Sequence, residues 1–136
     1  MNLLKRLLLI SLVSCSIITL NSCIIAAVAV GGATVAYIDG NYSMNIQGNY
    51  KDVYAAALKA VNENNDFVLV SKTIDNTNNN ADIEGATKID STSFSIEIEK
   101  LTNNASKVTI KFGTFGDQQM SSTLMDQIQA NVHQKS

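Results

Sequence analysis

The chain has 136 residues, 46% of them hydrophobic, and a formal net charge of −2. This length suits one domain with a core of its own. Arg6 is the single arginine and the lysines form no basic run. The composition therefore argues against nucleic acid as a partner, because phosphate and base recognition rely on arginine and clustered positive charge. Both cysteines, Cys15 and Cys23, lie near the N-terminus, so we expect no disulfide or thiol chemistry in the folded part.

The N-terminal segment has the layout of a secretory signal peptide that ends at a lipid-attachment cysteine. A positive pair at residues 5–6 precedes an apolar run at residues 7–20, and small Ser22 precedes Cys23, as in a cleaved signal. The pattern resembles the bacterial lipoprotein box, which implies cleavage before Cys23 and attachment of acyl chains, palmitate among them. We therefore expect residues 1–22 to be a signal peptide and these acyl chains to hold the protein on the membrane.

Two alternatives for this segment stay open. A second box at Leu12-Val13-Ser14-Cys15 would make Cys15 the acylated residue, after a shorter apolar region. Alternatively, residues 7–30 could form an uncleaved helix, which is long enough to span a bilayer. That helix would contain Asn21, and no basic cluster follows it.

The residues after Cys23 suggest a destination and a domain boundary. In the sorting rule known for bacterial lipoproteins, Asp directly after the acylated cysteine retains a protein in the inner membrane. Ile24 occupies that position, so resemblance to the rule implies the outer membrane, with the periplasmic or surface face undetermined. We expect residues 23–38 to form the lipidated cysteine and an apolar Ala/Gly-rich tether. The turn signal at Asp39-Gly40 opens a single globular domain over residues 39–136.

The first half of this domain predicts a strand, a helix and a second strand. Apolar and polar residues alternate over residues 42–47, as in a strand with one buried face. Residues 50–64 follow helical periodicity, with Asn49 as N-cap. Residues 67–70 are apolar at every position, which predicts a strand covered on both faces, near the sheet centre.

Two hairpins follow. Residues 83–89 and 93–101 are expected to pair about Asp90-Ser91, with Ile83 opposite Ile98 and Thr87 opposite Phe94. A second turn at residues 102–104 would then return the chain. The pairs expected across that turn are Phe94 with Phe112, Ile96 with Ile110, Ile98 with Val108, and Glu99 with Lys107.

The chain ends in a second predicted helix. Asp117 can cap it, and its apolar side comprises Met120, Leu124, Met125, Ile128 and Val132. Together these elements predict an α+β fold in the order β-α-β-β-β-β-α. We expect an antiparallel sheet of about five strands, packed on one side by both helices.

The candidates for site chemistry are few. Glu97 and Glu99 share a strand face, but alternating charges on a hairpin are ordinary cross-strand partners. The Gly-rich turn at residues 113–117 lacks the spacing of a phosphate loop and ends in an acid. His133 is the only histidine and lies close to the C-terminus. We therefore expect no catalytic residues, no metal site and no cofactor, and hence no enzyme.

The chain resembles a family of small bacterial lipoproteins built on a domain of unknown function, best known from Francisella. The segments that carry the resemblance are Cys23 with the Ala/Gly-rich stretch into Tyr37, Val53-Tyr54-Ala55-Ala56, Val108-Thr109-Ile110 and Gly113-Thr114-Phe115-Gly116-Asp117. This resemblance implies a compact α+β domain at the surface or in the periplasm, linked in some members with virulence. It implies no catalytic residues.

Two functions remain as hypotheses. The first is a non-enzymatic outer-membrane lipoprotein that acts as an envelope or virulence-associated protein-interaction domain, with a protein partner or a second copy of itself. The alternative is a carrier of a small apolar ligand in a cavity between sheet and helices. Met44, Met120 and Met125 are candidates to line such a cavity, because methionine adapts to irregular ligands.

Overall fold

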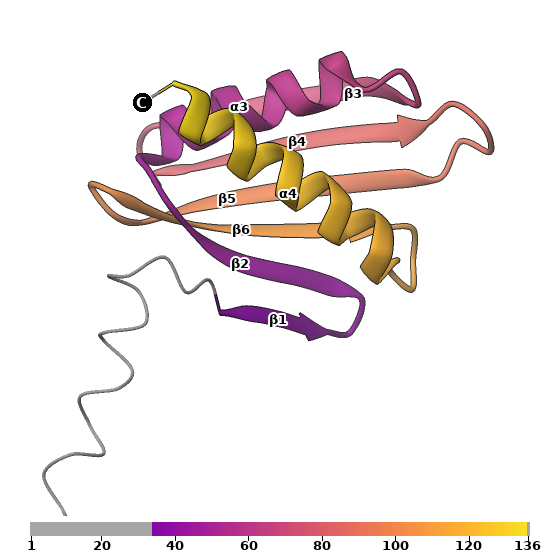
Figure 1. Ribbon diagram of the computed structural model, residues 1–136, viewed down its shortest axis with the longest axis horizontal. Helices are drawn as coiled ribbons and strands as arrows, with labels where there is room; N and C mark the ends of the chain where they lie inside the picture. The colour runs from indigo at the N-terminus through magenta and orange to yellow at the C-terminus, as the bar shows by residue number, and fades with distance from the viewer. Residues whose placement is uncertain (1–33, 136) are drawn as a thin grey trace, which may run out of the picture. The chain divides into compact units, whose positions relative to one another are not determined.

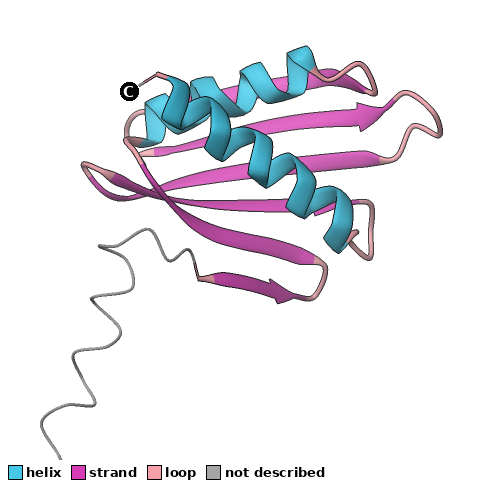
Figure 2. Ribbon diagram, in the orientation of Figure 1, coloured by secondary structure: helices cyan, strands magenta, loops and turns pink. Residues whose placement is uncertain are grey.

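Six strands form one antiparallel sheet in the computed structural model, which describes residues 34–135 (Figure 1). The strands lie in the order β1-β2-β6-β5-β4-β3, and both helices cover the same face of the sheet (Figure 2). The elements are β1 Val35–Ile38, β2 Asn41–Gln47, α3 Tyr50–Glu63, β3 Phe67–Asp75, β4 Asn80–Thr87, β5 Ser93–Thr102, β6 Ala105–Phe112 and α4 Gln118–Gln134. The predicted α+β class and element order are confirmed, with one additional strand at the start of the sheet.

Both helices begin directly after the residues predicted to cap them. At the start of α3, the Lys51 backbone N–H donates a 3.0 Å hydrogen bond to Asn49 Oδ1. At the start of α4, the Met120 backbone N–H donates one of 2.9 Å to Asp117 Oδ1. Such caps satisfy amides that have no partner inside the helix. Asp117 thus occupies an amide that a bound anion would need, which agrees with its predicted role as a cap.

The core lies between the helix-covered face of the sheet and the inner sides of the two helices. Residues of β6 alternate strictly between buried and half-buried positions. The predicted β5–β6 register is confirmed, since Ile96 pairs with Ile110 and Phe94 with Phe112. The apolar side predicted for α4 packs against this face, with Met120 partly buried and the rest buried: Leu124, Met125, Ile128 and Val132.

The predicted β4–β5 register is wrong by two residues. Ile83 lies opposite Ile96 instead of Ile98, and Gly85 lies opposite Phe94. The pairing closes earlier than predicted because the Thr87 backbone N–H donates a 2.9 Å hydrogen bond to the Thr92 carbonyl. Since side chains alternate with a period of two, this shift leaves the same residues facing the core.

The predicted position of residues 67–70 at the sheet centre is also wrong. They begin β3, which is an edge strand. Phe67 is buried, whereas Val68 is 47% and Val70 64% exposed. The physical reason is that both helices cover the same face of the sheet (Figure 2). Successive side chains of a strand point to opposite faces, so Val68, next to buried Phe67, lies on the uncovered face. A register shift between Leu69 and Ser71 adds a bulge at Val70.

Strand β1 was not predicted. Its four residues, assigned to the apolar tether from the sequence, pair with β2 from Val35 opposite Met44 to Ile38 opposite Asn41. The sheet therefore begins four residues before the predicted domain start. The expected turn at Asp39-Gly40 does form, and both residues have positive φ, 52° and 82°.

The face of the sheet opposite the helices is open and polar. Ser43 and Thr109 share a 2.9 Å hydrogen bond between their hydroxyls. Lys107 Nζ lies 3.8 Å from Glu99 Oε2, so the predicted cross-strand charge pair is confirmed. Within residues 34–135, neither helix is long and apolar enough to cross a membrane.

Candidate functional site

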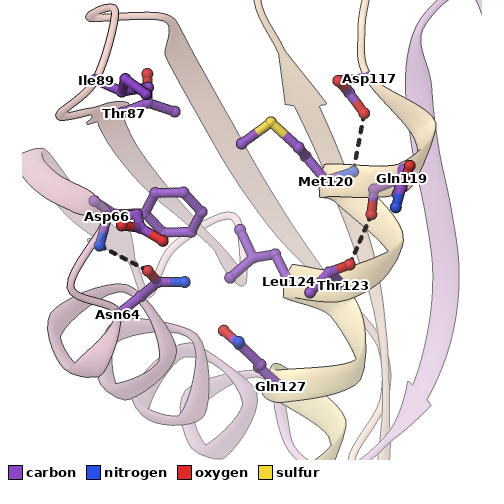
Figure 3. Close-up of a pocket in the computed structure, with 11 residues that line it drawn as sticks. Asn64, Asp66, Thr87, Ile89, Asp117, Gln119, Met120, Thr123, Leu124 and Gln127 are labelled. Carbon is purple, nitrogen blue, oxygen red and sulfur yellow. Dashed lines mark hydrogen bonds between the residues drawn. The ribbon is translucent and has the colours of Figure 1, made fainter.

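The two helices touch at one end and separate at the other (Figure 1). At the closed end, Lys135 Nζ lies 3.0 Å from Asp52 Oδ1. The Asn131 side-chain amide donates a 3.2 Å hydrogen bond to the Ala56 carbonyl. At the open end, a cleft of about 450 Å³ lies between α4 and the loops that follow α3 and β4 (Figure 3). This volume falls within the range of pockets that bind small ligands or single side chains.

The inner wall of the cleft is apolar and fixed by the core. Phe67, Met120 and Leu124 line it. The Phe67 ring packs 4.9 Å from the Phe94 ring and 5.7 Å from the Phe112 ring, measured between centroids. Leu124 is fully buried, whereas Met120 is only partly buried. The cleft therefore has a rigid aromatic base and one flexible thioether side chain.

Two loops form one side of the cleft and are bonded to each other. In the loop after α3, the Asp66 backbone N–H donates a 2.9 Å hydrogen bond to Asn64 Oδ1. The Lys88 backbone N–H, in the loop between β4 and β5, donates a 2.8 Å hydrogen bond to the Asp66 carbonyl. These bonds fix the position of Asp66, which lines the cleft (Figure 3).

The β4–β5 loop is itself closed by a carboxylate. The buried Thr87 hydroxyl donates a hydrogen bond to Asp90, and the Thr92 backbone N–H donates one of 3.0 Å to the same carboxylate. These hydrogen bonds, that from Thr87 first, hold the pKa of Asp90 below its ordinary value. A carboxylate with a lowered pKa is a weak base, so this pair stabilises the loop and is poorly suited to activate Thr87 as a nucleophile.

The opposite side of the cleft comes from α4. Asp117 lies at the start of this helix, and Gln119 and Gln127 also line the cleft. The Thr123 hydroxyl donates a 2.9 Å hydrogen bond to the Gln119 carbonyl (Figure 3). Asp66 and Asp117 are the charged side chains in the lining, and no histidine, cysteine or lysine joins them. An apolar base inside an amide-rich, acidic rim can bind an apolar group, especially one flanked by positive charge.

The described residues contain no group of three or more His, Cys, Asp or Glu side chains placed to hold a metal ion. Glu97 and Glu99 lie on the open face of the sheet, away from the cleft, and Glu97 stands opposite Asp82. His133 is exposed in the last turn of α4 and lines a second hollow beside Asp52 and Lys135. The candidate acylation sites Cys15 and Cys23 lie outside the described residues.

The methionines predicted to line a cavity divide between two environments. Met120 lines the cleft, whereas Met44 and Met125 are buried in the core. Asp66 and Thr87 also line the cleft and were not singled out from the sequence. Both stand at the ends of elements, where no periodic pattern marks them. The cleft forms where the two helices separate, and the sequence pattern of a single helix does not predict how it packs against the other.

Comparison with known families assigns the chain to one of them. A family model described as "Protein of unknown function (DUF3568)" matches residues 6–131. The chain belongs to this family. A search of curated proteins finds no significant match. The match to DUF3568 includes most of the N-terminal segment and every element that forms the cleft, and it supplies no activity for them.

Proposed function

We propose that this DUF3568 protein is a non-enzymatic outer-membrane lipoprotein, similar to the small lipoproteins known from Francisella. Its domain would bind an envelope or virulence-associated protein partner. The observation that carries the binding role is the cleft at the open end of the helices, which joins an apolar base to an acidic rim. The lipoprotein assignment is supported by the apolar run and Ser22 before Cys23.

The exposed position of this cleft favours a protein partner. Ile89 lines the cleft and is 93% exposed. An apolar side chain in that position favours partner binding, since it would gain burial when a partner covers it. Asp66 and Asp117 favour a partner segment that places an apolar side chain between lysines or arginines, because opposite charges guide association.

The alternative function is transport of a small apolar ligand. The volume of about 450 Å³ and the flexible Met120 favour it. A carrier, however, usually encloses most of its ligand, and Met44 and Met125 fill the core instead of lining the site. The protein-binding function is therefore the better supported of the two.

Photocrosslinking from the cleft tests whether the site binds a protein partner or a small ligand. We would place a photoreactive phenylalanine derivative at Gln127 of the full-length protein in its own envelope. One defined protein adduct is expected, and the additional change Met120→Gln should reduce it several-fold, because a polar amide would replace the apolar side chain. The matched control is Ala130→Gln, on the exposed side of the same helix and outside the cleft lining, which should leave the adduct unchanged.

Two results would contradict partner binding in the cleft. An adduct equally strong with Met120→Gln and with Ala130→Gln would place the partner elsewhere. A small molecule released from the intact protein in native mass spectrometry, with no protein adduct, would favour the carrier function.

The anchor is tested by labelling with a palmitate analogue. Cys23→Ala is expected to abolish labelling and to release the protein from the membrane fraction, whereas Cys15→Ala should affect neither. The physical reason is that loss of the acyl chains removes most of the apolar area that binds the bilayer. The reverse result would assign the anchor to Cys15. Persistent membrane association of the double variant without label would instead favour an uncleaved helix.

A further inference from the structure

The two edges of the sheet differ in a way that points to a covered surface at β1. Edge strands expose unpaired backbone groups, and proteins usually protect them with charges or bulges. The β3 edge has both, with Lys72 on the strand and a bulge at Val70. The β1 edge has neither, since its four residues are uncharged and pair with β2 in unbroken register.

Strand β1 is also rich in exposed apolar side chains. Val35 is 45%, Tyr37 38% and Ile38 66% exposed. Exposed apolar side chains on an edge strand gain burial when another surface covers them.

A further exposed apolar residue lies beside the end of β1. Phe115 lies in the loop between β6 and α4 and is 90% exposed. The backbone of this loop abuts the β1–β2 turn, because a Cβ added to Gly116 would lie 2.3 Å from the Gly40 carbonyl oxygen. Figure 1 shows the two loops at the same end of the sheet. Ile38 and Phe115 therefore belong to one corner of the domain.

The length of chain before β1 bears on what covers this edge. Ten uncharged residues, 24–33, separate Cys23 from the first described residue. Even fully extended, ten residues reach at most about 35 Å. If Cys23 is acylated, β1 is the first element of the domain that the chain reaches from the bilayer. The head-group region of a bilayer is a suitable surface for this edge, because tyrosine rings such as that of Tyr37 are enriched at the membrane–water interface.

We propose that the β1 edge and the Phe115 corner rest on the lipid surface, with Ile38, Tyr37 and Phe115 in contact with the head-group region. This inference rests on the proposed anchor and adds a contact made by the domain itself. The contact is interfacial, because the free backbone groups of β1 need water or head groups as partners and would be unsatisfied in hydrocarbon. Exposed Asp39 at the same corner means that the contact does not depend on anionic lipid.

The absence of tryptophan from the chain allows a direct test with single-tryptophan variants. Full-length lipidated protein carrying Phe115→Trp, Ile38→Trp or Val70→Trp would be reconstituted into phosphatidylethanolamine–phosphatidylcholine vesicles, with and without brominated acyl chains. We expect brominated lipid to reduce the emission of Phe115→Trp and Ile38→Trp roughly twofold, as for a ring at the boundary between head groups and acyl chains. Val70→Trp, on the exposed β3 edge, is the matched control and should not be quenched.

Four results would overturn the proposal. The first is that all three variants bind vesicles but brominated lipid quenches none of them. This result would leave the proposed anchor intact. The second is quenching that is equal at all three positions. The third is a blue shift of Phe115→Trp that brominated lipid does not quench and that disappears on dilution of protein in lipid, which would assign the edge to a second copy. Protein that fails to float with vesicles would refute the anchor, and with it this contact.

Discussion

Replacement of Gly116 by alanine is expected to lower the free energy of unfolding by about 2–5 kcal/mol, as a left-handed backbone penalty combined with overpacking. Gly116 has a φ of +81°, and its added Cβ would lie 2.3 Å from the Gly40 carbonyl oxygen and 2.4 Å from the Gly40 Cα. The clash involves backbone on both sides, so no side chain can rotate away to relieve it. Urea unfolding of the full-length protein in mild detergent, followed by circular dichroism, measures the loss.

Gly113→Ala is the matched control for this prediction. Gly113 lies in the same loop and also has a positive φ, +64°, but its added Cβ would meet only the Thr92 methyl group, at 3.4 Å. This variant should lose only about 1–2 kcal/mol, the cost of a left-handed non-glycine residue. Equal losses for Gly113→Ala and Gly116→Ala would refute the tight contact between the two loops. That contact is also what holds Phe115 beside β1.

The features that could be predicted from the sequence are those that depend on residues close together in the chain. Asn49 and Asp117 cap their helices as expected because a cap depends on a few consecutive residues. The β5–β6 register was also predictable, since residues 103–104 leave little freedom in the turn and the apolar pairs fit only one alignment. The adjoining β4–β5 register was not, because the closing bond between Thr87 and Thr92 depends on loop conformation.

Long-range arrangement could not be predicted in the same way. Residues 67–70 read as a central strand because apolar residues at every position usually mean cover on both faces. The fold puts them at an edge, with Val68 and Val70 exposed. Strand β1 was missed for a related reason, since residues 24–38 form one apolar stretch in which no change of composition marks the start of the sheet. Pairing with β2 decides it.

The candidate site shows the same limit. Met120 was identified because apolar periodicity placed it on the inner side of α4, and it lines the cleft. Asp66 and Thr87 were missed because their positions depend on hydrogen bonds between loops that are distant in sequence. A binding surface of this kind requires knowledge of which helix ends separate, and composition does not supply it.

The aromatic base of the cleft depends on a glycine on the neighbouring strand. Gly85 lies opposite Phe94, and a Cβ added to Gly85 would lie 2.3 Å from Phe94 Cζ. The Phe94 ring has no room to retreat, because its centroid lies 4.9 Å from that of Phe67 and 4.8 Å from that of Phe112. Gly85→Ala is therefore expected to lower the free energy of unfolding by about 1–3 kcal/mol, the usual cost of overpacking.

A double-mutant cycle separates this clash from a general loss of strand stability. Phe94→Leu removes the ring atoms nearest to Gly85 and should itself be destabilising, because it leaves space beside Phe67. In that background, Gly85→Ala should cost less than about 0.5 kcal/mol, so that the coupling energy is about 0.5–3 kcal/mol. Additive effects in urea unfolding would mean that Gly85 is not required by the ring. Strong coupling would show that this one glycine permits the three-ring cluster beneath the proposed binding site.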